Sequence, residues 1–126
     1  MSEDFQSTSP IYMQLADRIN RQILRGDLKP GEKLPSVREM GMQSNVNPNT
    51  VQRTYQVLEG SNIVESRRGQ GTFVTEDPAI LESMRERLKQ EEISYFIGVM
   101  RDMGYTAEEI KAGIADFFKQ TKEDLR

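Results

Sequence analysis

The chain has 126 residues, a net charge of −3, 36% hydrophobic residues and 29% charged residues. These values predict a soluble protein with one small domain and a helical appendage. Cysteine and histidine are both absent, which excludes disulfides, thiolate or histidine metal sites, cysteine nucleophiles and Ser-His triads. We therefore expect no enzyme, no metal and no cofactor, and a protein suited to the reducing cytoplasm.

The first ten residues are polar and acidic, which is unlike a signal peptide. No apolar run approaches the roughly 18 residues that a membrane helix needs, so no membrane partner is expected. Residues 1–76 carry nine Lys/Arg and nine Asp/Glu, whereas residues 77–126 carry eight and eleven. The excess of acid thus belongs to the second part, and the neutral first part is compatible with nucleic-acid binding.

The first predicted helix covers residues 10–25. Ser9 and Pro10 have the residue types of a helix cap and a first helical position. Apolar residues then recur every fourth position from Ile11 to Ile23, which is typical of an amphipathic helix. Gly26 is expected to end this helix, and residues 27–31 to form a turn.

Two further helices are expected to follow. Ser36 and Glu39 have the spacing of a capping box, which predicts a short helix over residues 36–43. After a break at residues 44–46, Asn47-Pro48 repeats the cap-plus-proline start, and a third helix over residues 47–59 should end at Gly60. The inward side of the third helix is expected to consist of Val51, Tyr55 and Leu58.

A β-hairpin is expected next. Residues 63–66 and 72–75 are short β-type runs, and the glycine-containing segment 67–71 joins them. Asp77-Pro78 is the expected junction between a first domain, residues 1–76, and a tail, residues 77–126.

The tail is predicted to contain two helices, one ending at Gly104 and one beginning at the capping box of Thr106 and Glu109. Two short helices enclose little core, so their apolar side needs another surface. That surface is either the first domain of the same chain or a second copy, and we favour a homodimer. The predicted interface residues are Ile93, Phe96, Ile97, Met100, Ile110, Ile114 and Phe117.

The order helix, short helix, turn, helix and hairpin is that of a winged helix-turn-helix, so the predicted fold class is α+β. In such a unit the helix after the turn enters the major groove of DNA. Asn and Gln side chains can pair with adenine, Arg with guanine, and Thr can contact a thymine methyl or a phosphate. The candidates are Asn47, Asn49, Thr50, Gln52 and Arg53. Caps and a solvated helix surface are the alternative interpretation.

The hairpin loop and the second helix supply further candidates. Arginines can neutralise phosphates and small glycines let a loop approach the minor groove, although a solvated hairpin tip is the alternative. Arg38 is either a DNA contact or a surface residue paired with Glu39 or Glu59. The loop candidates are Arg67, Arg68, Gly69, Gln70 and Gly71.

Four segments carry a resemblance to a known family: residues 10–15, 26–39, 46–51 and 69–74. Together they resemble the GntR family of bacterial regulators, and the short tail and Asn-Pro-Asn-Thr sequence are most similar to its YtrA-type subfamily. The resemblance implies dimerisation through the tail. The sequence departs from the commoner pattern at Pro48 and Gln52, where many relatives carry arginine.

The resemblance also implies residue roles. Arg38 would contact a guanine or the DNA backbone, and Gly69 would enter the minor groove. Three residues would anchor phosphates: Ser36, Thr50 and Tyr55. Four would lie on or near the major groove: Asn47, Asn49, Gln52 and Arg53.

We therefore expect a homodimeric repressor that binds a palindromic operator and controls a transport operon. A winged helix that binds only proteins is the alternative. A small-molecule effector could bind between the tail and the first domain, although no residue cluster indicates one. Three acidic residues of the tail resemble metal ligands, but a solvated helix surface is the favoured interpretation: Glu108, Glu109 and Asp116.

Overall fold

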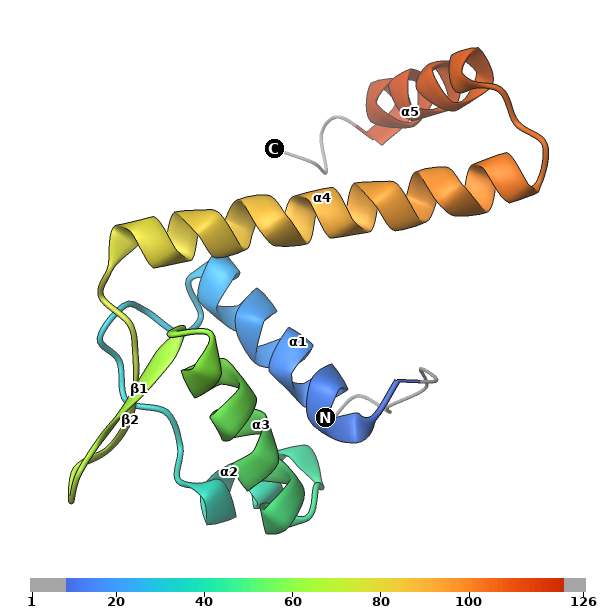
Figure 1. The fold of residues 1–126 in the computed structure, drawn as a ribbon. Helices are drawn as coiled ribbons and strands as arrows, with labels where there is room; N and C mark the ends of the chain where they lie inside the picture. Colours follow the sequence, from blue (N-terminus) through green and yellow to red (C-terminus); the bar gives the residue numbers. More distant parts are fainter. Residues whose placement is uncertain (1–8, 122–126) are drawn as a thin grey trace. The chain divides into compact units, whose positions relative to one another are not determined.

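The computed structural model describes residues 9–121, which form five helices and one two-stranded antiparallel hairpin (Figure 1). The α+β class is therefore as predicted. In chain order the elements are α1 (Ile11–Arg25), α2 (Val37–Ser44), α3 (Pro48–Gly60), β1 (Val64–Arg67), β2 (Gly71–Val74), α4 (Pro78–Asp102) and α5 (Ala107–Thr121).

The chain divides into two compact units, Met1–Arg85 and Glu86–Arg126, and the division falls within α4. The first unit contains α1 to α3, the hairpin and the first turns of α4. Met84 is buried, and Arg85 Nη2 donates to the carbonyl oxygen of Leu24 at 3.1 Å. The beginning of α4 is thus held on the first unit by apolar burial and by a cation at the C-terminal end of α1.

The core of the first unit forms where α1 and α2 pack against α3. Leu15 and Ile19 of α1 are fully buried, as are Val51 and Leu58 of α3. Burying each such side chain contributes about 1.5–3 kcal/mol. The 3.6-residue periodicity predicted this arrangement, because it places these residues on one side of each helix.

The start of α1 differs from the prediction. Pro10, not Ser9, occupies the N-cap position, with φ −60° and ψ 150° and no side-chain cap bond. Gln14 Nε2 instead donates to the carbonyl oxygen of Ser9 at 2.7 Å. Gly26 ends the helix as predicted, because it adopts the left-handed φ of 88° that glycine accepts without strain.

The predicted capping box at α2 is confirmed. Ser36 Oγ accepts from the Glu39 amide at 3.1 Å, and the Ser36 amide donates to Glu39 Oε1 at 2.9 Å. The hydrogen bond from the Ser36 amide lowers the pKa of the Glu39 carboxyl most, and a hydrogen bond from the Ser36 side chain lowers it further. The helix ends at Ser44, one residue beyond the expected bound, and Asn45 then turns the chain with φ 57°.

The end of α3 is a correction. Gly60 is the last residue of the helix rather than its stop, and it has no positive φ. The chain reverses two residues later at Asn62, with φ 65°, a conformation that asparagine tolerates better than most residues. The Ile63 amide then donates to the Leu58 carbonyl at 3.0 Å, which closes the helix end.

The hairpin has a three-residue loop. Its register pairs Val64 with Val74 and Arg67 with Gly71. Residues 31–34 border the other edge of β2, although only the first of them was assigned, to a turn, from the sequence. Their amides and carbonyls exchange hydrogen bonds with β2, including Leu34 N to Thr72 O at 2.8 Å. β2 is therefore hydrogen-bonded on both edges, to β1 on one and to residues 31–34 on the other.

The second unit contains the remainder of α4 and all of α5. Gly104, with φ 92°, follows α4, and Thr106 and Glu109 form the predicted capping box of α5 at 2.9 and 3.2 Å. Ile110 is the one buried side chain of α5. Across the described residues, no helix combines the length and apolar character that crossing a bilayer requires.

Candidate nucleic-acid interface

The two sides of α3 separate as the sequence predicted. Val51 and Leu58 are buried on the inner side, whereas Asn49, Gln52 and Arg53 are exposed. The side chains of Asn49 and Gln52 form no hydrogen bond with any of residues 9–121. The outer side of α3 is therefore a polar surface that a DNA groove can contact.

Asn47 and Thr50 begin this helix and have different environments. Asn47 is exposed, and its Oδ1 accepts from the Asn49 amide at 2.8 Å, so its side chain is a cap. Its NH₂ group remains able to donate. Thr50 is half-buried at the edge of the same turn. A phosphate near this end would meet the positive end of the helix dipole.

Arg38 projects from α2 and is exposed. It forms no ion pair within the described part of the chain, so neither Glu39 nor Glu59 neutralises it. Glu39 is instead engaged with Ser36. The Ser36 hydroxyl accepts from the Glu39 amide at 3.1 Å and also interacts with the Glu39 carboxylate, whose pKa it lowers.

Tyr55 requires a correction. The resemblance implied that it anchors a phosphate, but the residue is buried and its hydroxyl donates to the Pro35 carbonyl at 2.7 Å. Burial, and to a lesser degree the charge of Glu39, raises the pKa of this phenol. Its single proton is thus committed inside the protein, where it fixes the segment leading into α2.

The wing arginines differ from each other. The Arg67 guanidinium stacks 4.1 Å above the Phe73 ring centroid and lies 3.6 Å from Glu65, so its charge is partly compensated. Arg68 is exposed at the hairpin tip without an ion-pair partner in residues 9–121. Of the two predicted phosphate contacts, Arg68 is the better placed.

The rest of the hairpin loop is shaped by two glycines. Gly69 lies at the exposed tip with φ 74°, beside the exposed Gln70. Gly71 has φ 126°, and a Cβ there would lie 2.6 Å from Lys33 Cε. Gly71 therefore lets the Lys33 side chain pass across the hairpin beside its loop.

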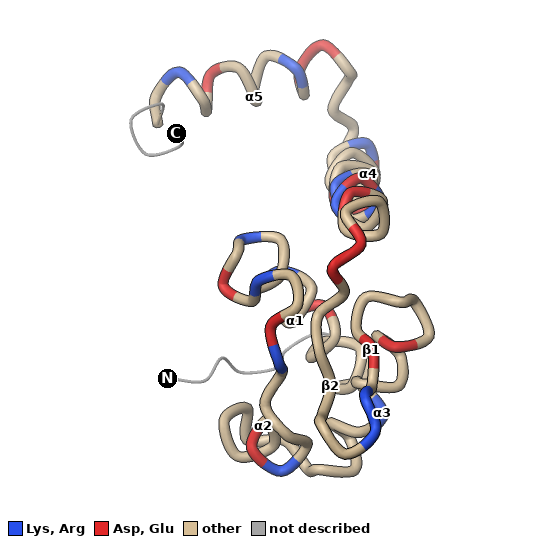
Figure 2. Tube along the Cα trace, turned by 90° about the vertical axis from the view of Figure 1, so that its left-hand side faces the viewer, with Lys and Arg blue, Asp and Glu red and all other residues tan. Residues whose placement is uncertain are grey.

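These parts gather at one end of the first unit. In Figure 1 the hairpin tip, α2 and the beginning of α3 point the same way, and Figure 2 shows basic segments there, beside the labels α2 and α3. A helix flanked by a hairpin can place one element in the major groove and the other along the backbone or minor groove. The geometry fits double-stranded DNA.

Three further residues, Gln56, Lys33 and Tyr12, were not predicted from the sequence to belong to this interface. Gln56 is exposed three residues after Arg53, and helical spacing could have identified it. Lys33 is exposed, and its backbone forms an isolated antiparallel β-bridge with Phe73. Tyr12, in the first turn of α1, contacts Arg53. The last two depend on contacts between distant segments, for which the sequence carries no local signal.

Residues 11–74 match the model of the family described as bacterial regulatory proteins, gntR family. The chain belongs to the GntR family. The match covers half of the chain and includes α1, α2, α3 and the hairpin. As a GntR-family member, the chain is a DNA-binding transcription regulator and not an enzyme. Its DNA-binding character also argues against the alternative of a purely protein-binding winged helix.

Two relatives from Bacillus subtilis (strain 168) align with this chain over most of their own length. The chain is 49% identical to the uncharacterized HTH-type transcriptional regulator YhcF, over 93% of this chain and 97% of the relative. It is 40% identical to the HTH-type transcriptional repressor YtrA, over 69% of this chain and 72% of the relative. The YtrA-type resemblance is thereby confirmed.

Two solved structures are similar as well. A GntR family transcriptional regulator from Listeria monocytogenes aligns with a TM-score of 0.82 and 35% identity, covering 89% of this chain and 98% of that one. The AraR DNA-binding domain in complex with operator ORX1 aligns with a TM-score of 0.54 and 29% identity, covering 59% of this chain and 96% of that one. The first likeness therefore includes most of this chain, and the second structure shows a DNA-binding domain of similar fold in complex with its operator.

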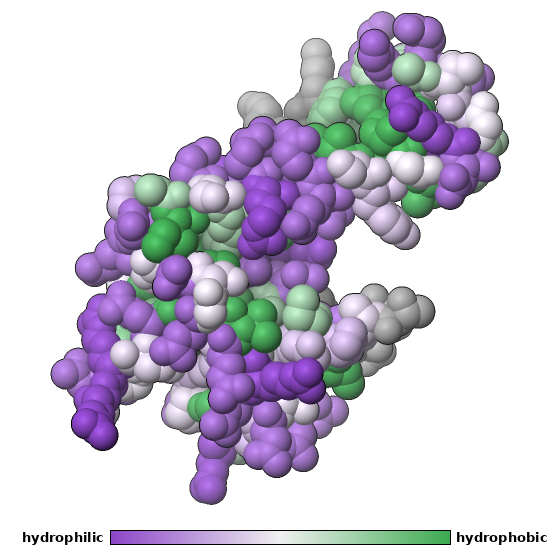
Figure 3. Space-filling model, viewed as in Figure 1, coloured by the Kyte–Doolittle hydropathy of each residue, from purple (hydrophilic) through white to green (hydrophobic). Residues whose placement is uncertain are grey.

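The seven predicted interface residues of the tail fall into two groups. Ile93, Phe96, Ile114 and Phe117 are exposed, with Phe117 56% accessible. The other three are covered to different degrees: Ile97 and Met100 are half-buried, and Ile110 is buried. Figure 3 shows hydrophobic residues at the surface of α5.

No group of three His, Cys, Asp or Glu side chains in the described chain is arranged to hold a metal ion.

Proposed function

We propose that this GntR regulator is a repressor that binds a palindromic operator as a homodimer. Residues 1–76 would bind DNA and residues 77–126 would form the dimer. The observation that carries the proposal is the outer side of α3, where Asn49, Gln52 and Arg53 are exposed. Arg38 of α2 is exposed too, and it has no ion-pair partner in residues 9–121. The name of the relative YtrA supports repression as the direction of regulation.

The proposed roles follow from the environments of the side chains. Asn49, Gln52 and Arg53 would contact base edges, and Arg38 would contact a guanine or the backbone beside them. Three groups would bind the backbone: Ser36, the α3 start at Asn47 and Thr50, and the loop residues Arg68, Gly69 and Gln70. Arg67 and Gly71 would shape the wing, and Tyr55 would support α2 from inside.

DNA selection tests this proposal directly. The full-length protein is incubated with random duplexes, and the recovered duplexes are sequenced over several rounds. We expect two inverted half-sites whose centres are separated by about one helical turn or a multiple of it. Failure to enrich any motif would refute specific operator binding, and a single half-site would refute the palindrome.

Arg38 provides the residue-level test. Arg38→Ala should weaken binding to the selected duplex by about 1–3 kcal/mol and relax the preference at one base pair of each half-site. The matched control is Arg87→Ala in α4, because Arg87 is paired with Glu91 at 3.3 Å in the second unit. Unchanged affinity and base preference in Arg38→Ala would remove this residue from the interface.

Exposed apolar side chains support dimerisation through the tail. Phe117 and Ile114 on α5 and Phe96 and Ile93 on α4 are large hydrophobic groups in contact with solvent, and such groups commonly mark an interface. Phe117→Glu should convert the dimer to a monomer in sedimentation experiments and weaken binding to the palindromic duplex. Tyr95→Glu is the control, because Tyr95 lies about 200° around α4 from Ile93.

The regulated gene is the most distant part of the proposal. On the YtrA-type resemblance we propose that the repressor acts in the cytoplasm on an operon for a transport system. Deleting the gene and sequencing total RNA should show increased transcripts of a transporter whose promoter carries the selected motif. Decreased transcripts at that promoter would indicate an activator instead.

A further inference from the structure

Arg53 of α3 stacks on an aromatic ring of another helix. Its Cζ atom lies 4.0 Å from the centroid of the Tyr12 ring, and Arg53 Nη2 donates to Tyr12 Oη in a long hydrogen bond of 3.4 Å. Tyr12 lies in the first turn of α1 and is half-buried. The two residues are 41 positions apart, so the contact depends on how α1 packs against α3.

A buried hydroxyl fixes this contact. Thr54, next to Arg53, is fully buried, and its Oγ1 donates to the Tyr12 carbonyl at 2.9 Å and lies 3.1 Å from the Thr50 carbonyl. A bond to the backbone of Tyr12 holds the first turn of α1 at a set distance from α3. The Tyr12 ring consequently lies under Arg53 because of the fold and not through a chance surface contact.

Stacking leaves the hydrogen-bonding edge of Arg53 available. The five N–H donors of a guanidinium lie in its plane, and the Tyr12 ring covers one of its flat surfaces. One donor, on Nη2, is used in the long bond to Tyr12 Oη, and the others form no hydrogen bond with residues 9–121. Arg53 forms no ion pair with a carboxylate of residues 9–121. Arg67 is the contrast in the same unit, because it stacks on Phe73 but also lies 3.6 Å from Glu65.

We infer that Tyr12 is a positioning residue for DNA recognition, which holds the Arg53 guanidinium over α3 so that its edge meets a guanine in the major groove. The inference rests on the proposed operator binding and adds a residue outside the helix-turn-helix. An arginine side chain loses rotamer entropy when it is immobilised. Stacking on Tyr12 immobilises Arg53 before DNA arrives, so less of that entropy is lost on binding.

A double-mutant cycle measures the coupling. The wild type, Tyr12→Leu, Arg53→Ala and the double variant are titrated against the duplex that the wild-type protein selects from random DNA. We expect Tyr12→Leu to raise Kd about three- to tenfold in the wild-type background, in the range of cation–π energies, and to have no effect when Arg53 is absent. Tyr12→Phe keeps the ring and should remain within twofold of the wild type.

The matched control is a second mutant cycle in which Gln52, a neighbour of Arg53 on the same surface, takes the place of Arg53. Gln52 is exposed but does not stack on Tyr12, so the effects of Tyr12→Leu and Gln52→Ala should multiply independently. Thermal unfolding of each variant separates loss of fold from loss of binding. If Tyr12→Leu is unstable, Tyr12→Met, which also lacks an aromatic ring, takes its place in the cycle.

Base preference provides the second readout. Repeating the selection with Tyr12→Leu should weaken the preference for the guanine that Arg53→Ala loses, and leave the other positions unchanged. Independent effects of Tyr12→Leu and Arg53→Ala, or coupling without any change in base preference, would overturn the inference. If the wild-type protein selects no duplex at all, operator binding fails instead, so the two failures are distinguishable.

Discussion

The buried phenol of Tyr55 allows a prediction about stability and pH. Its hydroxyl donates to the Pro35 carbonyl at 2.7 Å, immediately before the Ser36 cap of α2. Tyr55→Phe removes this bond and changes little else. The expected loss is about 1 kcal/mol at pH 7, which corresponds to a decrease in Tm of about 4–8 °C for a unit of this size.

The same bond should make the difference depend on alkaline pH. Burial raises the pKa of Tyr55 above its usual value of 10.0 in the folded protein, whereas in the unfolded chain the phenol ionises near pH 10. Its contribution to stability is therefore complete below pH 10 and declines as the pH rises further. The decline is about 1.4 kcal/mol per pH unit, because the unfolded state alone releases the proton.

Urea unfolding followed by circular dichroism tests both statements. The wild type should be more stable than Tyr55→Phe by about 1 kcal/mol at pH 7. The two stabilities should meet between about pH 10.5 and pH 11, because the ionisation loss reaches about 1.4 kcal/mol at pH 11 and then exceeds that difference. The other tyrosines are present in both proteins and cancel in the comparison. Curves that stay parallel up to pH 11 would refute the account of a buried, proton-donating phenol.

Four further substitutions test local features of the first unit. Ser36→Ala removes the cap of α2 and should lower stability by about 1 kcal/mol in urea unfolding; an unchanged midpoint would contradict the capping box. Gly71→Ala should lower the free energy of unfolding by about 1–3 kcal/mol, because Gly71 has a φ of 126°. Gly60→Ala should raise it slightly, because Gly60 is helical and nothing lies within 4 Å of a new Cβ. Equal effects of the two substitutions would contradict this difference. Asn20→Leu should leave stability equal or up to about 1–3 kcal/mol higher, since Asn20 Oδ1 is buried with no hydrogen-bond partner in the described chain; a loss measured by the same unfolding would show that the amide is satisfied.

Local signals explain why most helix bounds could be predicted. A capping box depends on residues three positions apart, so Ser36 with Glu39 and Thr106 with Glu109 identify helix starts without any knowledge of the fold. Gly26 likewise ends α1 through its own backbone conformation. In each case the deciding interaction lies within one turn of the helix.

The errors arose where two neighbouring residues could fulfil the same role. Ser9 and Pro10 both suit a helix start, and Gly60 and Asn62 both suit a helix end. The structure places the positive φ at Asn62 because α3 includes Gly60, and Ile63 must then pair with Thr75, the residue after β2, whose amide donates to the Ile63 carbonyl at 2.8 Å. That pairing partner is distant in sequence, so residue type alone could not identify Asn62.

The candidate site was predictable in its outline but not in its internal contacts. Periodicity distinguished Val51 from Gln52, because burial and exposure alternate with the helical repeat. It placed Thr54 in no group, although the structure buries it completely and bonds it to Tyr12. The contacts of Tyr12 in α1 with Thr54 and Arg53 in α3 come from tertiary packing, and they determine where Arg53 lies.

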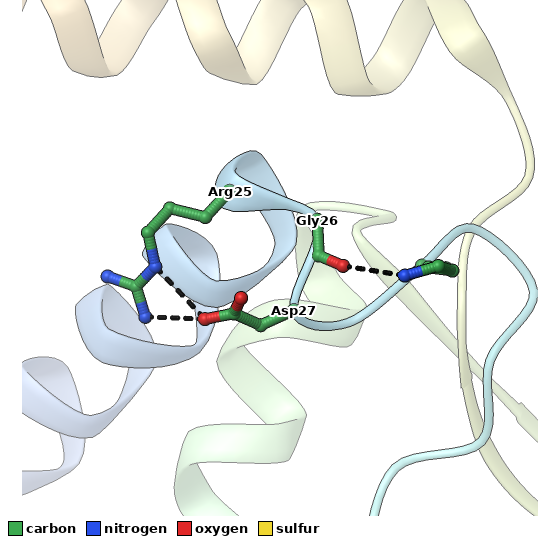
Figure 4. A network of polar contacts seen from close by, with 4 residues as sticks. Arg25, Gly26 and Asp27 are labelled. Carbon is green, nitrogen blue, oxygen red and sulfur yellow. Dashed lines mark hydrogen bonds and ion pairs between the residues drawn. The ribbon is translucent and has the colours of Figure 1, made fainter.

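The charge pattern of the first unit bears on how a neutral domain attracts DNA. Several acidic groups are occupied within the protein: Asp27 binds Arg25 at 2.8 Å, as Figure 4 shows, and Glu39 caps α2. Lys33 and Arg68, near the hairpin loop, form no ion pair with residues 9–121. Lys33 and Arg68 are therefore available to meet DNA phosphates although the domain as a whole carries no net charge.

The salt dependence of operator binding tests this argument. Replacing Lys33 and Arg68 by alanine removes four cations from a dimer and should reduce the slope of log K against log salt concentration by about 3–4. Arg25→Ala is the control, because Arg25 is already neutralised by Asp27, and it should leave the slope unchanged. An unchanged slope in the double variant would mean that neither side chain binds a phosphate, and that attraction to DNA arises elsewhere on this unit.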